Sequence, residues 1–73
     1  MMETRNKINY TIALVNEFAQ RYRLSLRDAF DYLYRYGAIA FVKEFYDVEH
    51  TLSFFDAVDD CVQICKNNGG LLV

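Results

Sequence analysis

Apolar residues recur every three or four positions along most of this chain, and polar residues fill the positions between them. This spacing places apolar side chains on one face of an α-helix. Four segments show the pattern and predict helices over residues 7–22, 26–36, 38–47 and 53–67. The apolar run 38–42 could also form a buried strand, but no second segment offers a strand to pair with it. The pattern therefore predicts an all-α fold, a compact bundle of about four short helices.

Each predicted helix has one face that we expect to be buried. In chain order, these faces comprise Ile8, Ile12, Val15, Ala19 and Tyr22; Leu26, Ala29, Phe30 and Leu33; Ala38, Phe41, Val42 and Phe45; and Phe54, Phe55, Val58, Cys61, Val62 and Cys65. A core built from 73 residues contributes only about 3–5 kcal/mol of stability. We therefore expect a single helical domain over residues 1–73 that associates with itself or with a partner.

The same helix-start pattern occurs twice, as LSLRDAFD and as LSFFDAVD. In each copy a serine, Ser25 or Ser53, is placed to cap the free amides of the first turn. The aspartate three residues later, Asp28 or Asp56, occupies the acidic position of a capping box. We interpret the repeat as shared helix-start chemistry, since two copies are too few for a repeat protein.

Glycines mark the ends of two predicted helices. Gly37 follows the second helix, and the pair Gly69-Gly70 follows the fourth. Glycine takes the left-handed conformation of a helix C-terminus without steric cost. Beyond the pair, the apolar residues Leu71, Leu72 and Val73 form a tail, residues 69–73, that packs back on the core, stays flexible or docks on another chain.

Composition narrows the class of protein. An apolar fraction of 53% with 16% aromatic residues predicts an ordered chain. Ten acidic residues outnumber eight basic ones, which argues against a nucleic-acid surface. No apolar run approaches the ~20 residues of a membrane span, and no secretory signal is evident, so we expect a cytoplasmic protein without membrane contact.

A DNA-binding alternative rests on the second and third helices, which meet at Gly37 and superficially resemble a helix-turn-helix. The positions that would enter the major groove are residues 39–44, where Lys43 is the only basic residue. Such a helix offers almost no group for phosphate or base contacts. We therefore rank DNA binding below protein interaction.

The stretch YDVEHTLSFFDAVDD contains the only histidine and most of the candidate chemistry. A serine hydrolase site is not expected, because the hydroxyl of Ser53 is engaged in capping a helix. Cys61 and Cys65 lie on successive turns of one helix and lack the further ligands of a zinc site. We expect no catalytic residue, no metal and no cofactor, and hence no enzyme.

The end of the third predicted helix and the turn that follows it form a predicted interhelical corner of Tyr46, Asp47, His50 and Thr51. Its histidine either holds two helices at a fixed angle or faces a partner. A second candidate group is Tyr32, Tyr34 and Tyr36, which cover more of the second helix than a narrow core-facing stripe requires. Tyrosine is enriched at protein interfaces, so these residues are candidate interface aromatics unless a wide core buries them.

The segment from Asn9 to Cys65 resembles a family of small uncharacterised bacterial proteins, a family defined by a domain of unknown function and found largely in gut Firmicutes and related anaerobes. Leu24-Ser25, Tyr36-Gly37, Phe45-Tyr46-Asp47, His50-Thr51 and the acidic segment 56–60 carry the resemblance. The family has no established activity. Its genes often stand beside those of small toxin-like proteins, including ones that look like ADP-ribosyltransferases. The resemblance therefore implies an antitoxin or accessory subunit that binds a co-encoded protein.

Overall fold

The computed structural model describes residues 2–71, with side chains from residue 5 onward. It contains the helices α1 (Met2–Tyr22), α2 (Leu26–Arg35), α3 (Ala38–Glu44), α4 (Tyr46–Glu49) and α5 (Phe54–Asn67). The described residues include no strand, so the prediction of a compact all-α bundle is confirmed. Four helices have seven residues or more, and α4 is a single short turn.

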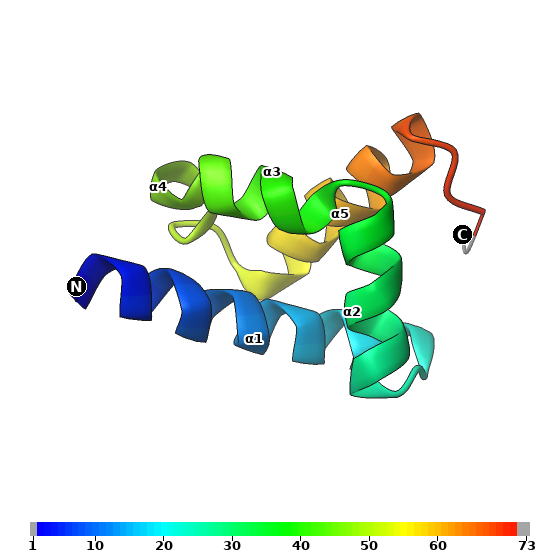
Figure 1. The fold of residues 1–73 in the computed structure, drawn as a ribbon, viewed down its shortest axis with the longest axis horizontal. Coiled ribbons are helices and arrows are strands. Elements are labelled where there is room, and N and C mark those ends of the chain that lie inside the picture. The colour runs from blue at the N-terminus through cyan, green and yellow to red at the C-terminus, as the bar shows by residue number, and fades with distance from the viewer. Residues whose placement is uncertain (1, 72–73) are drawn as a thin grey trace.

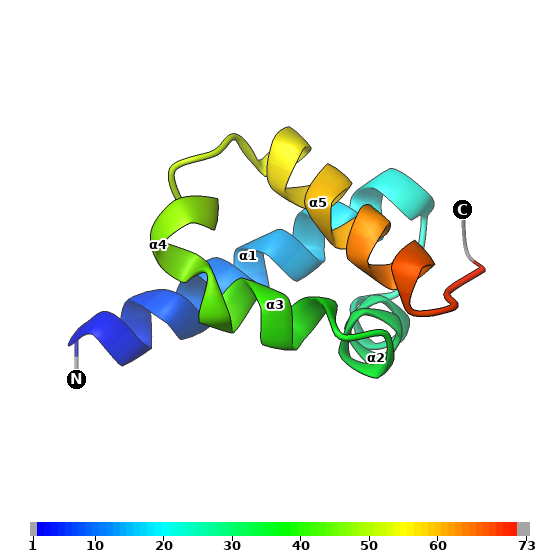
Figure 2. The same ribbon diagram turned by 90° about the horizontal axis from the view of Figure 1, so that it is seen from above.

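The helices are arranged in two layers, and a further helix covers one end of both layers. α1 forms one layer, and α3 and α5 lie beside each other over it, as the two views at right angles show (Figures 1 and 2). α2 stands across one end and contacts both α1 and α3 (Figure 1). At the other end α1 extends toward the N-terminus below α4 (Figure 1).

The core lies where α1, α2, α3 and α5 converge. Phe18 of α1 is completely buried, and its ring packs against Tyr22 and Tyr32 with centroids 4.8 and 6.0 Å away. Both cysteines are buried free thiols of this core. The other buried apolar residues are Leu14, Val15, Ala19, Ala29, Leu33, Ala38, Ile39, Val42, Ala57 and Val58.

The two predicted helix starts are present and nearly identical. The hydroxyl oxygen of Ser25 accepts the backbone N–H of Asp28 at 3.0 Å, and that of Ser53 accepts the N–H of Asp56 at 3.1 Å. The backbone dihedrals are −65° and 157° at Ser25, and −63° and 156° at Ser53. Each aspartate thus supplies its amide to the cap, and the repeated sequence corresponds to repeated local structure.

Three helices are followed by a residue whose backbone has the left-handed conformation. Gly37 (φ 85°) and Gly69 (φ 94°) take this conformation as predicted, and Arg23 (φ 56°) takes it at the end of α1. After α5, the N–H of Gly70 donates to the carbonyl of Cys65 at 2.7 Å, a carbonyl that also accepts the N–H of Asn68 at 3.1 Å. Gly70 is buried against the Tyr32 side chain, where a Cβ atom would collide with the hydroxyl. Residues 69 and 70 are therefore part of the fold.

The predicted apolar tail is only partly within the described residues. Leu71 is 90% exposed, and Leu72 and Val73 lie outside the described part of the chain.

The prediction of one continuous helix over residues 38–47 is wrong. The helix breaks at Phe45 (φ −104°, ψ 26°), which ends α3 and begins α4. The chain bends there without a proline or glycine, and the bend directs α4 toward the N-terminal half of α1 (Figure 1). The first helix also begins earlier than predicted, at Met2.

Several residues predicted to be buried are exposed instead. Helical spacing identifies a face, but burial also requires a neighbouring helix long enough to cover it. α1 has 21 residues, whereas α2 has 10 and α3 has 7, so the N-terminal half of α1 is covered incompletely. The exposed residues are Ile8, Ile12, Leu26, Phe30, Phe45, Phe54 and Phe55.

Within residues 2–71, none of the helices combines the length and apolar character that crossing a membrane requires.

Candidate functional site

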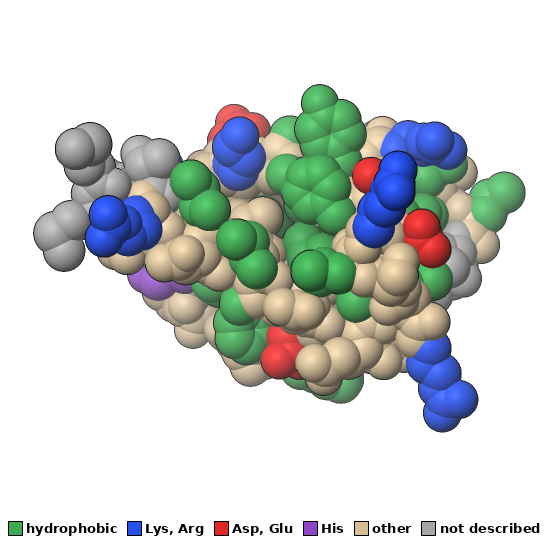
Figure 3. All heavy atoms as spheres, turned by 60° about the horizontal axis from the view of Figure 1, so that its bottom comes forward, with side chains coloured by type: hydrophobic (Ala, Val, Ile, Leu, Met, Phe, Trp, Pro, Cys, Tyr) green, Lys and Arg blue, Asp and Glu red, His purple; other side chains and the backbone are tan. Residues whose placement is uncertain are grey.

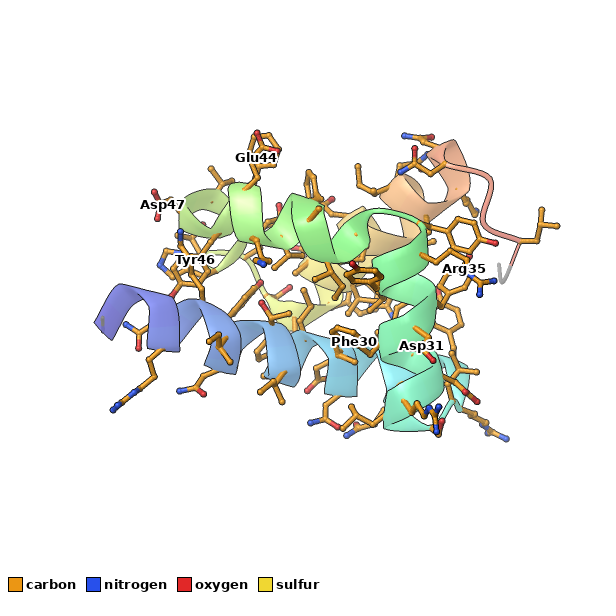
Figure 4. The ribbon with its side chains drawn as sticks, viewed as in Figure 1. Phe30, Asp31, Arg35, Glu44, Tyr46 and Asp47 are labelled. Carbon is orange, nitrogen blue, oxygen red and sulfur yellow. The ribbon has the colours of Figure 1, made fainter. Side chains whose placement is uncertain are left out.

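The predicted corner is formed by α4 and the turn that follows it. The Nδ1–H of His50 donates to the carbonyl oxygen of Tyr46 at 2.7 Å, and the two rings stack with centroids 4.5 Å apart. The hydroxyl of Thr51 donates to the carbonyl of Val48 at 2.6 Å. Asp47 lies on the outer side of α4, away from α1 (Figure 4). These local bonds favour the structural interpretation of His50, although its ring remains exposed.

A tyrosine of α1 connects this corner to the rest of the bundle through a hydrogen bond and ring contacts. The hydroxyl of Tyr10 donates to the backbone carbonyl of Glu49 at 2.9 Å. Its ring stacks on Phe54, and the ring of Tyr46 meets it edge-on, with both centroids 5.6 Å away. Burial and the nearby Glu49 carboxyl raise the pKa of Tyr10 to about 12, so the hydroxyl remains protonated and able to donate.

A buried carboxyl group, which the sequence pattern did not predict, lies behind the corner. Glu49 is only 3% exposed, and its Oε1 has no hydrogen-bond partner among the described residues. Burial, and then hydrogen bonding and repulsion from the carboxyl of Asp60, raise the pKa of Glu49 from 4.5 to about 7. An ionised carboxylate can only accept hydrogen bonds, so Glu49 must be protonated to donate one to Asp60. Helical spacing could not identify this residue, because the helix breaks at Phe45, between the buried Val42 and Glu49.

The three candidate interface tyrosines of α2 have different surroundings. Tyr32 is half-buried and packs on Phe18, and its ring lies 4.9 Å from that of the half-buried Tyr36. Tyr34 is 68% exposed and stacks on Phe30 with centroids 5.9 Å apart. Tyr34 is therefore the member of the group best placed to contact another chain.

A larger apolar surface lies where α1 meets α2 and α3. We call it the apolar face and define it by Ile8, Ile12, Leu26, Phe30 and Tyr34. Each of these large side chains is between 43% and 68% exposed. Figure 3 shows hydrophobic side chains gathered across this side of the molecule, with basic side chains toward both ends.

The apolar face contains two adjoining hollows, of about 480 and 390 Å³. Both are lined by Thr11, Ile12 and Phe30, so they form one continuous groove. Phe30 projects from α2 toward α1 at its centre (Figure 4). Lys7 and Lys43 line one end of the groove, and Arg27 and Asp31 line the other.

The side chains that could act as nucleophiles or metal ligands have structural roles. The hydroxyl of Ser53 accepts a backbone N–H, and the thiols of Cys61 and Cys65 are buried. Burial raises the pKa of Cys61 to about 12 and that of Cys65 to about 11, which keeps both as unreactive thiols. Among the residues described, His, Cys, Asp and Glu form no group of three that could hold a metal ion.

Comparison with known proteins gives a family and no activity. The family described as "Protein of unknown function (DUF3791)" matches residues 9–68, which include the corner and most of the apolar face. No curated protein and no solved structure matches the chain significantly. The resemblance to a family defined by a domain of unknown function is thus confirmed.

Proposed function

Because the chain belongs to DUF3791, a family whose description assigns no activity, we propose from its geometry that it is a non-catalytic protein-interaction module and that the apolar face is its contact surface. The proposal rests on one observation: five large apolar side chains stay exposed around a continuous groove. Exposed apolar patches of this kind are typical of protein-binding surfaces. The partner is a second copy of the chain or, as the resemblance implies, a co-encoded protein, for which the chain would act as an antitoxin-like accessory subunit.

The alternatives have less support. DNA binding by α3 would rest on its exposed residues Ala40, Lys43 and Glu44, of which only Lys43 is basic, so the helix offers almost no group for phosphate or base contacts. Catalysis would need a free nucleophile, whereas the hydroxyl of Ser53 caps α5 and both thiols are buried. A purely structural domain would not require such an apolar face to remain exposed.

The test is co-purification of the tagged chain with the product of the adjacent gene. We expect the wild-type chain to retain this product and the Phe30→Ser variant to lose it, because serine removes the central ring of the groove. Phe55→Ser is the matched control, since Phe55 is a 67% exposed phenylalanine outside the apolar face. Equal retention by Phe30→Ser and wild type would rule out this surface, and no retention by either would count against a co-encoded partner.

A further inference from the structure

We propose that the apolar face binds the same face of a second copy of this chain, in a two-fold symmetric dimer. The inference rests on the proposed function, because it uses the same surface, and it names the occupant of the groove.

The groove has a centre that a two-fold axis can occupy. Ile12 and Phe30 line both hollows, so they lie between its two ends. In a two-fold interface, residues on the axis meet their own equivalents, and each end of the groove meets the opposite end in the partner. Ile12 and Phe30 of the two copies would then form an apolar centre, with Ile8, Leu26 and Tyr34 around it.

The charged residues at the ends complement one another under this exchange. Lys7 and Lys43 line one end, and Asp31 lines the other. Within the described residues, neither Lys43 nor Asp31 has an ion-pair partner in its own copy. A two-fold axis through the centre would bring the lysines of one copy toward Asp31 of the other, twice per dimer. Arg27, one helical turn before Asp31, keeps that end close to neutral and limits the strength of the attraction.

The exposed area fits a weak dimer. A whole aromatic side chain buries 150–250 Å², so five roughly half-exposed large side chains offer on the order of 500 Å² per copy. Two copies would bury about 1,000 Å² of apolar surface, which is near the lower limit for a specific interface. We therefore expect dissociation in the micromolar range.

Sedimentation velocity between about 1 and 500 μM tests the dimer directly, because a two-copy interface of this size predicts a concentration-dependent monomer–dimer equilibrium. Phe30→Ser should shift the chain to monomer, and Phe55→Ser should leave the equilibrium unchanged. Circular dichroism checks that each variant remains helical. A wild-type chain that is monomeric throughout this range, or a dimer that Phe30→Ser does not weaken, would overturn the proposal.

Charge reversal tests the orientation without touching the core. Lys43→Glu and Asp31→Lys should each weaken the dimer roughly tenfold, because two symmetric surface pairs change from attraction to repulsion. The double variant Lys43→Glu/Asp31→Lys should restore dimerisation, since Glu at position 43 would then face Lys at position 31 of the partner. Failure of the double variant to recover affinity would overturn the two-fold arrangement.

The two proposals fail separately. A monomeric chain that still retains the adjacent gene product through Phe30 would overturn the dimer and support the proposed function. A dimer that depends on Phe30 but retains no other protein would support the present inference and overturn a co-encoded partner.

Discussion

At the scale of single residues, Glu49 is the least expected feature of the molecule. Its carboxyl is buried at the corner, with Tyr10 from α1 and Asp60 and Cys61 from α5 as its titratable neighbours. None of these neighbours is cationic, so burial of the ionised form is not compensated. The fold therefore favours the protonated form of Glu49.

The stability of the protein should depend on pH through this residue. The pKa of Glu49 is about 7 in the folded chain, against 4.5 without the fold, so the folded state binds more protons between these values. The free energy of unfolding should thus fall as pH rises from about 4.5 to 7, by a few kcal/mol at most. Urea denaturation at a series of pH values measures this change.

Glu49→Gln provides the matched comparison, because its amide has nearly the same shape and remains neutral. We expect the variant to lose the decline between pH 4.5 and 7 and to be at least as stable as wild type above pH 7. An identical pH profile for the two proteins would show that Glu49 is not the titrating group.

At the scale of helices, start signals were easier to predict than interruptions. Ser25 and Ser53 could be identified from sequence because a cap is a local interaction, between a hydroxyl and an amide three residues later. The break at Phe45 has no such local cause. It accompanies the contacts of Tyr10 with Tyr46 and Glu49, which join residues 36 and 39 positions apart and leave no periodic signal.

Each cap should contribute a similar amount of stability. Replacing the hydroxyl in Ser25→Ala or Ser53→Ala leaves an amide of the first turn unpaired, which should cost about 1 kcal/mol. The two losses should add in the double variant, since the sites start different helices. Thermal and urea denaturation measure both effects. Ser53→Asp should retain most of the stability, because aspartate also caps, and a loss equal to that of Ser53→Ala would contradict the capping explanation.

At the scale of the whole molecule, helical spacing predicted the fold class but not which faces would be covered. Leu33, Val42 and Val58 are buried as expected because several helices converge on them. Ile8 and Phe30 have the same spacing and stay exposed, because coverage depends on the lengths and crossing of neighbouring helices. The apolar face could therefore be located only once the three-dimensional arrangement was known.

The two core thiols offer a measure of global unfolding. Both are buried, with pKa values raised to about 12 and 11, so a disulfide reagent should reach them only when the bundle opens. At pH 8 we expect labelling of the native chain to be at least a hundredfold slower than in concentrated urea, and to accelerate in parallel with the loss of helical circular dichroism. Rapid labelling of both thiols in native buffer would contradict the buried core.

The hydrogen bond from Tyr10 to the Glu49 carbonyl also indicates in which order the parts of the chain fold. It spans 39 positions, more than half of the 73-residue chain. Closing a flexible loop of that length costs roughly 3 kcal/mol of chain entropy, whereas each helix closes only contacts between near neighbours. We therefore expect the helices to nucleate first and the corner to become ordered only after α1 has docked. Its amides would then be poor reporters of early folding events and good reporters of the completed native state.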